Sequence, residues 1–401
     1  MANTLITPTK VTREALRILH QKLNFVGNID LQYDSQYAVK GAKIGDTLQI
    51  REPNQYVVRT GATLSTQDTT ERTLPLQVST QKGVDLRFTS DDLTLDMDDF
   101  TKRIIQPAVS VLAANIEADA LSMVKGVYNT VINVGSAATY KKVMECRKSL
   151  VDNLTPMDNQ VVALLNTQDN VDLVDAMKGL FQDSSAIKEQ YREGMLGRTG
   201  GFDFFENTML PTLTSGTAVS ANTQYVINTA VSGATGVSGI VVSSAGSTTF
   251  TAGDVIQISG INRVHPETKA DTSVLQNFVV TADYSGGAGT ISIEPTIFTE
   301  GARQNVSKDI PAGSIIYKAT FGASATTTPS LFFHKEAFAF ATADLVMPND
   351  VDFKGRENFE GISMRVIRQY DISDDTFPCR LDVMYGYTPT RRGFATRLHS
   401  N

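Results

Sequence analysis

The feature that most constrains this chain is a long stretch without charge near its middle. From Leu213 to Gly253 the sequence contains no Asp, Glu, Lys or Arg, although charged residues make up 20% of the whole chain. Short alternating apolar runs continue beyond it, to about residue 320, and Gly, Ser, Asn and Asp turns separate them. Regular short strands of this kind are typical of a small antiparallel β-barrel or sandwich. We therefore predict a self-contained β-domain over residues 213–325.

The segments on either side of this β-domain predict a different, α/β body. Residues 138–212 contain two amphipathic helical patterns and a buried-strand run at Val161–Leu165. After a polar joint at 324–330, residues 331–401 contain strand patterns with too little neighbouring sequence to pair with. We expect these strands to return to the earlier body. The β-domain is then an insertion whose two ends lie close together.

A long polar segment near the N-terminal side predicts an arm. Residues 44–89 read as two strands that flank a tip from Glu52 to Arg72. The tip has few large apolar side chains, and a loop this long in a compact domain is either functional or disordered. With limbs of about ten residues at ~3.3 Å each, the arm can reach ~35 Å, far enough to lie across another subunit. Its charged residues would then find partners there, each exposed pair contributing about 0–1 kcal/mol. They are Arg51, Glu52, Arg59, Glu71 and Arg72.

Two helices complete the expected elements of the N-terminal third. Residues 11–25 place an apolar stripe at helical spacing. So short a helix is not stable alone in water, so the stripe must dock either on its own body or on a partner. A 3.6-residue rhythm from about Asp98 to Tyr128 predicts a long helix, in which Pro107 marks either a kink or the first turn.

No motif for catalysis or cofactor binding stands out. Four glycines fall between Gly194 and Gly201, but the spacing matches neither phosphate-loop pattern and no strand precedes them, so a plain glycine turn is favoured. The four histidines are scattered, and for His334 a structural role at a strand end is favoured. Cys146 and Cys379 have no metal-ligand spacing. We expect no enzyme activity, no cofactor and no metal.

Charge and hydropathy limit the kinds of partner that the chain is expected to bind. The formal net charge of −7 gives no overall attraction to phosphate backbones, which argues against sequence-specific nucleic-acid binding. The N-terminus lacks the apolar core of a secretory signal. Apolar runs such as Val161–Leu165 are far shorter than the ~20 residues of a membrane helix, so no membrane contact is expected.

The order of these parts resembles a known family of viral proteins. The order is a terminal helix, a two-stranded arm, a long helix, an α/β body, an inserted β-domain and returning strands. Together with the segments at 191–217 (YREGMLGRTGGFDFFENTMLPTLTSGT), 331–348 (LFFHKEAFAFATADLVMP) and 379–398 (CRLDVMYGYTPTRRGFATRL), it resembles the major capsid proteins of tailed bacteriophages. In particular the chain is similar to coat proteins of short-tailed phages that carry an inserted domain on the Hong Kong 97 capsid fold.

The resemblance implies an α+β, Hong Kong 97-like fold over nearly the whole chain. It implies that Arg13 and Arg17 belong to an N-terminal arm and contact neighbouring subunits, as the charged residues of the extended loop do. The glycine-rich stretch becomes the exit from the axial domain into the insert. The implied divisions are an N-terminal arm at 1–32; a peripheral domain at 33–137 with an extended loop at about 51–82 and a spine helix at about 98–128; the first part of an axial domain at 138–212; an inserted β-barrel at 213–325; and returning strands at 326–401.

The resemblance also implies a function and partners. The chain would assemble with itself, as hexamers and pentamers, into an icosahedral shell that encloses double-stranded DNA by non-specific contact. A scaffolding protein and a portal would take part, and the virion would be assembled in the host cytoplasm. The alternative hypothesis is a phage or bacterial surface fibre or adhesin, since a charge-poor β-domain rich in Thr, Ser and Gly could bind a glycan.

Overall fold

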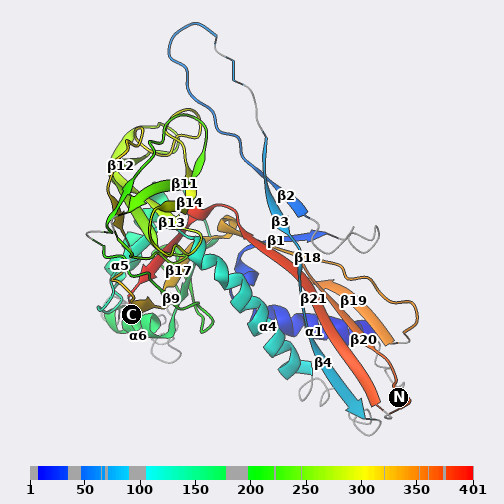
Figure 1. Ribbon diagram of the computed structural model, residues 1–401. Helices are drawn as coiled ribbons and strands as arrows, with labels where there is room; N and C mark the ends of the chain where they lie inside the picture. The colour runs from blue at the N-terminus through cyan, green and yellow to red at the C-terminus, as the bar shows by residue number, and fades with distance from the viewer. Residues whose placement is uncertain are drawn as a thin grey trace. The chain divides into compact units, whose positions relative to one another are not determined.

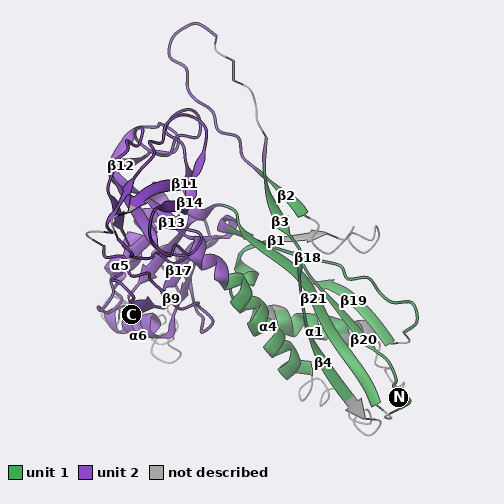
Figure 2. Ribbon diagram, viewed as in Figure 1, with its two compact units in different colours: residues 1–51, 73–121, 338–390 green, residues 52–72, 122–337, 391–401 purple. Residues whose placement is uncertain are grey.

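The computed structural model has a mixed α+β architecture that divides into two compact units (Figures 1 and 2). Unit 1 comprises residues 1–51, 73–121 and 338–390, and unit 2 comprises residues 52–72, 122–337 and 391–401. The structure describes residues 8–34, 47–64, 66–67, 71–89, 105–177, 197–220, 223–244, 246–319, 321–351, 353–359, 361–373 and 376–400.

Unit 1 is built on a six-stranded sheet whose centre is the long strand β21, Thr376–Pro389. This strand pairs antiparallel with β18, β20 and β4, while β19 pairs with β20 and β1 runs parallel to β18. The bounds are β1 Asp30–Asp34, β4 Thr80–Thr89, β18 Phe338–Ala343, β19 Phe353–Phe359 and β20 Ile362–Arg368. Most of the C-terminal strands therefore return to the N-terminal third of the chain.

The N-terminal helix α1, Pro8–Lys22, packs within its own unit, against β19, β20 and α4. Its stripe of Ala15, Leu16 and Leu19 is almost fully buried. The sequence left open whether this stripe docks on the subunit's own body or on a partner. The structure shows that it docks on the subunit's own body. Just beyond the helix, the backbone N–H of Phe25 donates a 2.6 Å hydrogen bond to the buried carboxylate of Glu117 on α4.

We expect replacement of Glu117 by leucine to destabilise unit 1 by about 1–3 kcal/mol, because the buried N–H of Phe25 loses its acceptor. Leucine is a good helix former, so helix propensity would not account for the loss. Glu117→Gln keeps a carbonyl oxygen at this place and is expected to stay closer to wild type. Urea unfolding followed by circular dichroism measures the difference, and equal midpoints for the Leu and Gln variants would contradict it.

The described part of the long helix begins next to Pro107. Helix α4 spans Gln106–Leu121 and is followed by a 3-10 turn, η4, at Ser122–Gly126. Pro107 lies in the first turn, where its missing N–H removes no hydrogen bond. The helical stretch ends at Gly126, two residues before the expected end at about Tyr128, and residues 98–104 lie outside the described residues.

The same stretch corrects the expectation about membrane-length runs. Within the described part of the chain, Gln106–Gly126 is one helical stretch of 21 residues, with mean hydropathy 1.2, that is long and apolar enough to cross a membrane by length and composition. However, 56% of that window is buried inside the protein. Its Glu117 bonds the backbone of Phe25, as expected for a core helix.

Two segments of unit 1 approach each other closely at a glycine. After β3, Arg72–Gln77, the chain passes across β21 at Gly386, where an added Cβ would overlap the carbonyl oxygen of Gln77 and lie 3.0 Å from the Cα of Val78. Both neighbours are backbone atoms, which cannot rotate away.

We expect Gly386→Ala to lower the stability by about 1–3 kcal/mol in a melting experiment. Gly322→Ala is the matched control, since its Cβ would meet nothing within 4 Å. Equal melting temperatures for the two variants would contradict the argument.

Unit 2 contains the α/β body as a second six-stranded sheet, in the order β5-β22-β17-β6-β8-β7. Strands β6, β17 and β22 are buried along their whole lengths, and α5 packs on β22 and β17. The bounds are β5 Thr130–Ile132, α5 Tyr140–Asp152, β6 Val161–Leu165, α6 Thr167–Met177, β7 Arg198–Thr199, β8 Phe202–Glu206, β17 Ser330–His334 and β22 Ala395–His399. The strand at 161–165 and both helical patterns are thus confirmed.

The glycine-rich stretch is a hairpin turn in this sheet. Gly200 and Gly201 join β7 to β8 with φ of +62° and +90°, values that favour glycine. The turn is therefore a glycine turn, as expected, but it lies within the sheet, and the chain leaves the body only after β8. Residues 178–196, which include the expected helical segment before it, lie outside the described residues.

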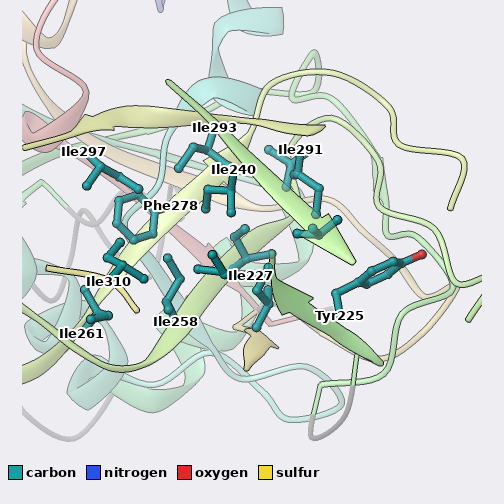
Figure 3. Close-up of a cluster of buried hydrophobic side chains, with 14 of the residues drawn as sticks. Tyr225, Ile227, Ile240, Ile258, Ile261, Phe278, Ile291, Ile293, Ile297 and Ile310 are labelled. Carbon is teal, nitrogen blue, oxygen red and sulfur yellow. The ribbon is translucent and has the colours of Figure 1, made fainter. Parts of the chain in front are cut away.

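The charge-poor segment forms a third six-stranded sheet, all antiparallel, in the order β10-β11-β14-β13-β12-β15. Its bounds are β10 Tyr225–Ile227, β11 Val237–Ser244, β12 Val255–Val264, β13 Asp271–Val280, β14 Gly289–Ile297 and β15 Ile316–Lys318. Figure 3 shows its isoleucine-rich core, with Ile227, Ile240, Ile293 and Phe278 pointing toward one another. The segment thus has a hydrophobic core of its own.

The two ends of this segment meet in a short two-stranded ribbon. Strand β9, Leu213–Thr214, pairs antiparallel with β16, Thr326–Thr327. Hydroxyl contacts support the pairing, at 3.0 Å between Thr214 and Thr326 and 3.2 Å between Thr212 and Thr328. Adjacent ends are what an insertion requires.

Candidate assembly surface

The predicted arm is the loop between β2, Thr47–Glu52, and β3. Its described part carries four large exposed apolar side chains. The two strands form a two-stranded sheet, and the loop of residues 53–71 leaves it (Figure 1). Within the loop the exposed fractions are 56% for Tyr56, 44% for Val57, 89% for Val58 and 78% for Leu64. Exposed apolar residues grouped in one segment are typical of an interaction site.

Two of the predicted contact residues pair with each other at the base of the loop. Arg72 Nη1 lies 2.8 Å from Glu52 Oε2, so these charges meet within one subunit. Arg59 donates a hydrogen bond to the carbonyl of Gly61, whose φ of +103° forms the turn at the tip. Arg51 and Glu71 are exposed, and neither is without a partner.

The two candidates on α1 make contacts within unit 1. Arg17 Nη2 lies 2.6 Å from Glu14 Oε1, and this hydrogen bond lowers the pKa of Glu14. Arg13 lies 3.6 Å from Glu357 of β19, and its side chain is 71% exposed. Exposed pairs of this kind contribute little stability.

Sequence reasoning missed a buried charged cluster where the β-rich segment at 213–325 begins and ends. The Lys318 side chain, 0% exposed, donates to Ser215 Oγ at 2.9 Å and to the carbonyls of Gly216 at 2.9 Å and Ala218 at 3.2 Å. Its Nζ lies 3.7 Å from Asp254 Oδ1. Burial lowers the pKa of Lys318, and Asp254 opposes that shift. We call Lys318, Asp254 and Ser215 the junction cluster.

Arg397 lies beside this cluster on β22 and links the sheet of the α/β body to the β-rich segment. Its Nη2 donates a 2.9 Å hydrogen bond to the carbonyl of Gly253, and the residue is fully buried. Burial lowers the pKa of Arg397 to about 10, so the group stays charged near neutral pH. An isolated lysine or arginine in a polar sequence gives no periodic signal, so only the folded chain reveals these contacts.

A polar cavity of about 310 Å³ lies between α5 and the β12–β13 hairpin. Along its wall Arg263 Nη2 lies 2.6 Å from Asp152 Oδ2, and Lys148 lies 3.6 Å from the same carboxylate. Tyr128 also lines it, and burial raises the pKa of that phenol to about 12. These charges pair with one another, so the wall offers no set of groups arranged for proton transfer.

The buried His334 and the two cysteines also lie where a structural role suits them. His334 is buried at the end of β17, with Nε2 3.3 Å from Asp158 Oδ1 and Nδ1 accepting from the backbone of Glu336 at 3.2 Å. Cys146 and Cys379 are buried and free. Among the described residues, no group of three or more His, Cys, Asp or Glu is placed to hold a metal ion.

Exposed apolar side chains on a loop, together with a β-rich segment that has its own core, are features of proteins that assemble with other chains, as coat proteins do. Residues 37–394 match the sequence profile described as "P22 coat protein - gene protein 5". The chain belongs to this P22 coat protein family, and it is a phage major capsid protein of the virion shell. The family match covers the β-rich segment as well, which decides against the adhesin hypothesis.

No curated protein sequence matches the chain, whereas several solved structures are similar to it. Similar solved structures include the mature capsid of bacteriophage PhiM1, at 10% identity and TM-score 0.46, covering 94% of this chain and 86% of that one. Mycobacterium phage Che8 gives 11% identity and TM-score 0.44, covering 91% and 88%. The CUS-3 coat protein I-domain gives 21% identity and TM-score 0.19, covering 23% of this chain and 92% of that one.

Proposed function

We propose that this coat protein builds an icosahedral shell of hexamers and pentamers in which the loop at 53–71 lies on a neighbouring copy. The observation that carries the proposal is the exposure of Tyr56, Val58 and Leu64 on a loop that has no core of its own. Burial of such side chains against another subunit would stabilise the contact by about 25 cal/mol per Å² of apolar area. A closed lattice repeats the contact in every subunit.

We also propose that the fold is Hong Kong 97-like and that the inserted segment is a closed β-barrel. In support, Val226 of β10 forms a bridge with Ile315 beside β15, and Ile227 exchanges hydrogen bonds of 2.7 and 2.9 Å with Gly313 and Ser314. These contacts join the first and last strands of the sheet. On this proposal 1–32 is the N-terminal arm, 33–137 the peripheral domain, 138–212 the axial domain, 213–325 the insert, and 326–401 the returning strands.

The proposed partners are those that a DNA-filled shell needs. A net charge of −7 suits a lining that does not hold packaged double-stranded DNA tightly. A scaffolding protein and a portal would direct closure during assembly in the host cytoplasm. The proposed role is structural, without catalysis.

Expression of the full chain, alone and with a scaffolding protein from the same phage, tests this proposal. We expect large closed particles in sedimentation and in electron micrographs. A protein that remains monomeric under both conditions would overturn the proposal.

A further inference from the structure

Gln67 links the two limbs of the loop at 53–71 through its side chain. Its Nε2 donates a 2.6 Å hydrogen bond to the carbonyl of Val57, and its Oε1 accepts a 2.9 Å hydrogen bond from the N–H of the same residue. One carboxamide therefore satisfies both backbone groups of a residue ten positions away. This reciprocal pair reproduces the pattern by which two antiparallel strands hold each other.

The link lies where the loop carries its apolar side chains. Tyr56 and Val58 flank Val57, and all three are at least 44% exposed. A limb whose central residue is bonded on both backbone groups has fewer conformations to lose when it docks, and this lowers the entropic cost of binding. An exposed hydrogen bond contributes little in water, but it gains strength when a partner excludes the solvent.

We propose that Gln67 is a positioning residue for shell assembly, which clamps Val57 and so presents residues 56–58 in the extended form that a second copy of this chain binds. This inference rests on the proposed function. Gln67 itself supplies no apolar contact, and its effect is on the shape of the limb opposite.

The first test replaces Gln67 by alanine in the full-length protein. We expect the concentration needed for particle formation, measured by sedimentation, to rise about tenfold, as expected for the loss of two hydrogen bonds that become buried. The melting temperature of the unassembled subunit should not change, because the loop is exposed. Gln55→Ala is the matched control, since Gln55 is an exposed glutamine on the opposite limb.

The second test uses Gln67→Glu, which preserves the shape and makes the clamp titratable. Above the ordinary glutamic acid pKa of about 4.3, the carboxylate would face the Val57 carbonyl without a proton to donate, so assembly should be impaired. Below that pKa the protonated acid donates as the amide does, so assembly relative to wild type should recover. The other charged groups described on the loop and at its base are Arg51, Glu71, the Glu52–Arg72 pair and Arg59, which is held by Gly61. Wild type and Gln67→Ala share these groups and are therefore measured at each pH.

The outcomes separate the two proposals. If wild type forms no particles, the proposed function fails. If wild type, Gln55→Ala and Gln67→Ala all assemble at one concentration, or Gln67→Glu shows no recovery at low pH, the clamp is overturned while the shell function stands.

Discussion

Shortening the loop between β2 and β3 is expected to abolish particles while leaving a folded subunit. In this variant an Asn-Gly turn, which suits a tight hairpin, replaces residues 53–71. The described residues of this loop, 53–64, 66–67 and 71, are exposed and lie outside the buried cores, so the melting temperature should change by no more than a few degrees. Sedimentation should show only unassembled protein, because the apolar contact with the neighbouring copy is missing.

A second variant separates the reach of the loop from its chemistry. Replacing Tyr56, Val58 and Leu64 by serine keeps the loop length and removes its largest exposed apolar side chains. We expect this variant to be as defective as the shortened one. Normal particles from the serine variant would show that the loop acts through other groups, and normal particles from the shortened variant would remove the loop from assembly altogether.

Replacing Lys318 by methionine is expected to give the largest loss of stability among single substitutions considered for this protein. The change leaves Asp254, only 2% exposed, as a buried charge without its lysine, and it removes donors from Ser215 Oγ and two carbonyls. Breaking a buried pair from one side costs about 3–5 kcal/mol. Urea unfolding of the variant should show an earlier transition for the inserted segment.

The control and the double variant make the test specific. Lys308→Met replaces an exposed lysine in the same segment and should stay within about 0.5 kcal/mol of wild type. Lys318→Met combined with Asp254→Asn removes the buried carboxylate charge as well, so its loss should be smaller than the sum of the single losses. Strict additivity would mean that Lys318 acts by packing and not through the charge of Asp254.

The parts of the fold that follow from local pattern could be predicted from the sequence. The apolar alternation between Tyr225 and Lys318 specifies short strands because successive side chains point to opposite faces. The buried run Val161–Leu165 and the helix at Tyr140–Asp152 are equally local signals. The place of Pro107 in the first turn of α4 could not be chosen from periodicity alone, because a proline suits either a kink or a first turn.

Long-range contacts and single polar residues could not be predicted. The stripe of α1 is satisfied by β19 and β20, more than three hundred residues away, and no local pattern encodes that choice. Charged residues such as Glu52 and Arg72 could be named as contact candidates, but their mutual pairing depends on strand register. Gln67 is uncharged and belongs to no periodic pattern, so nothing in the sequence indicates its hydrogen bonds to Val57.

The distant docking site of α1 has a consequence for synthesis. About 330 residues separate Lys22 from Phe353, the first residue of β19. At ~5–20 residues per second, a ribosome needs roughly 15–70 s to make that stretch. During this interval the apolar stripe of the nascent chain can pack on α4 but not yet on β19 and β20, so part of its native surface is missing. A chaperone that shields amphipathic helices would therefore raise the yield of coat protein most when translation is slow.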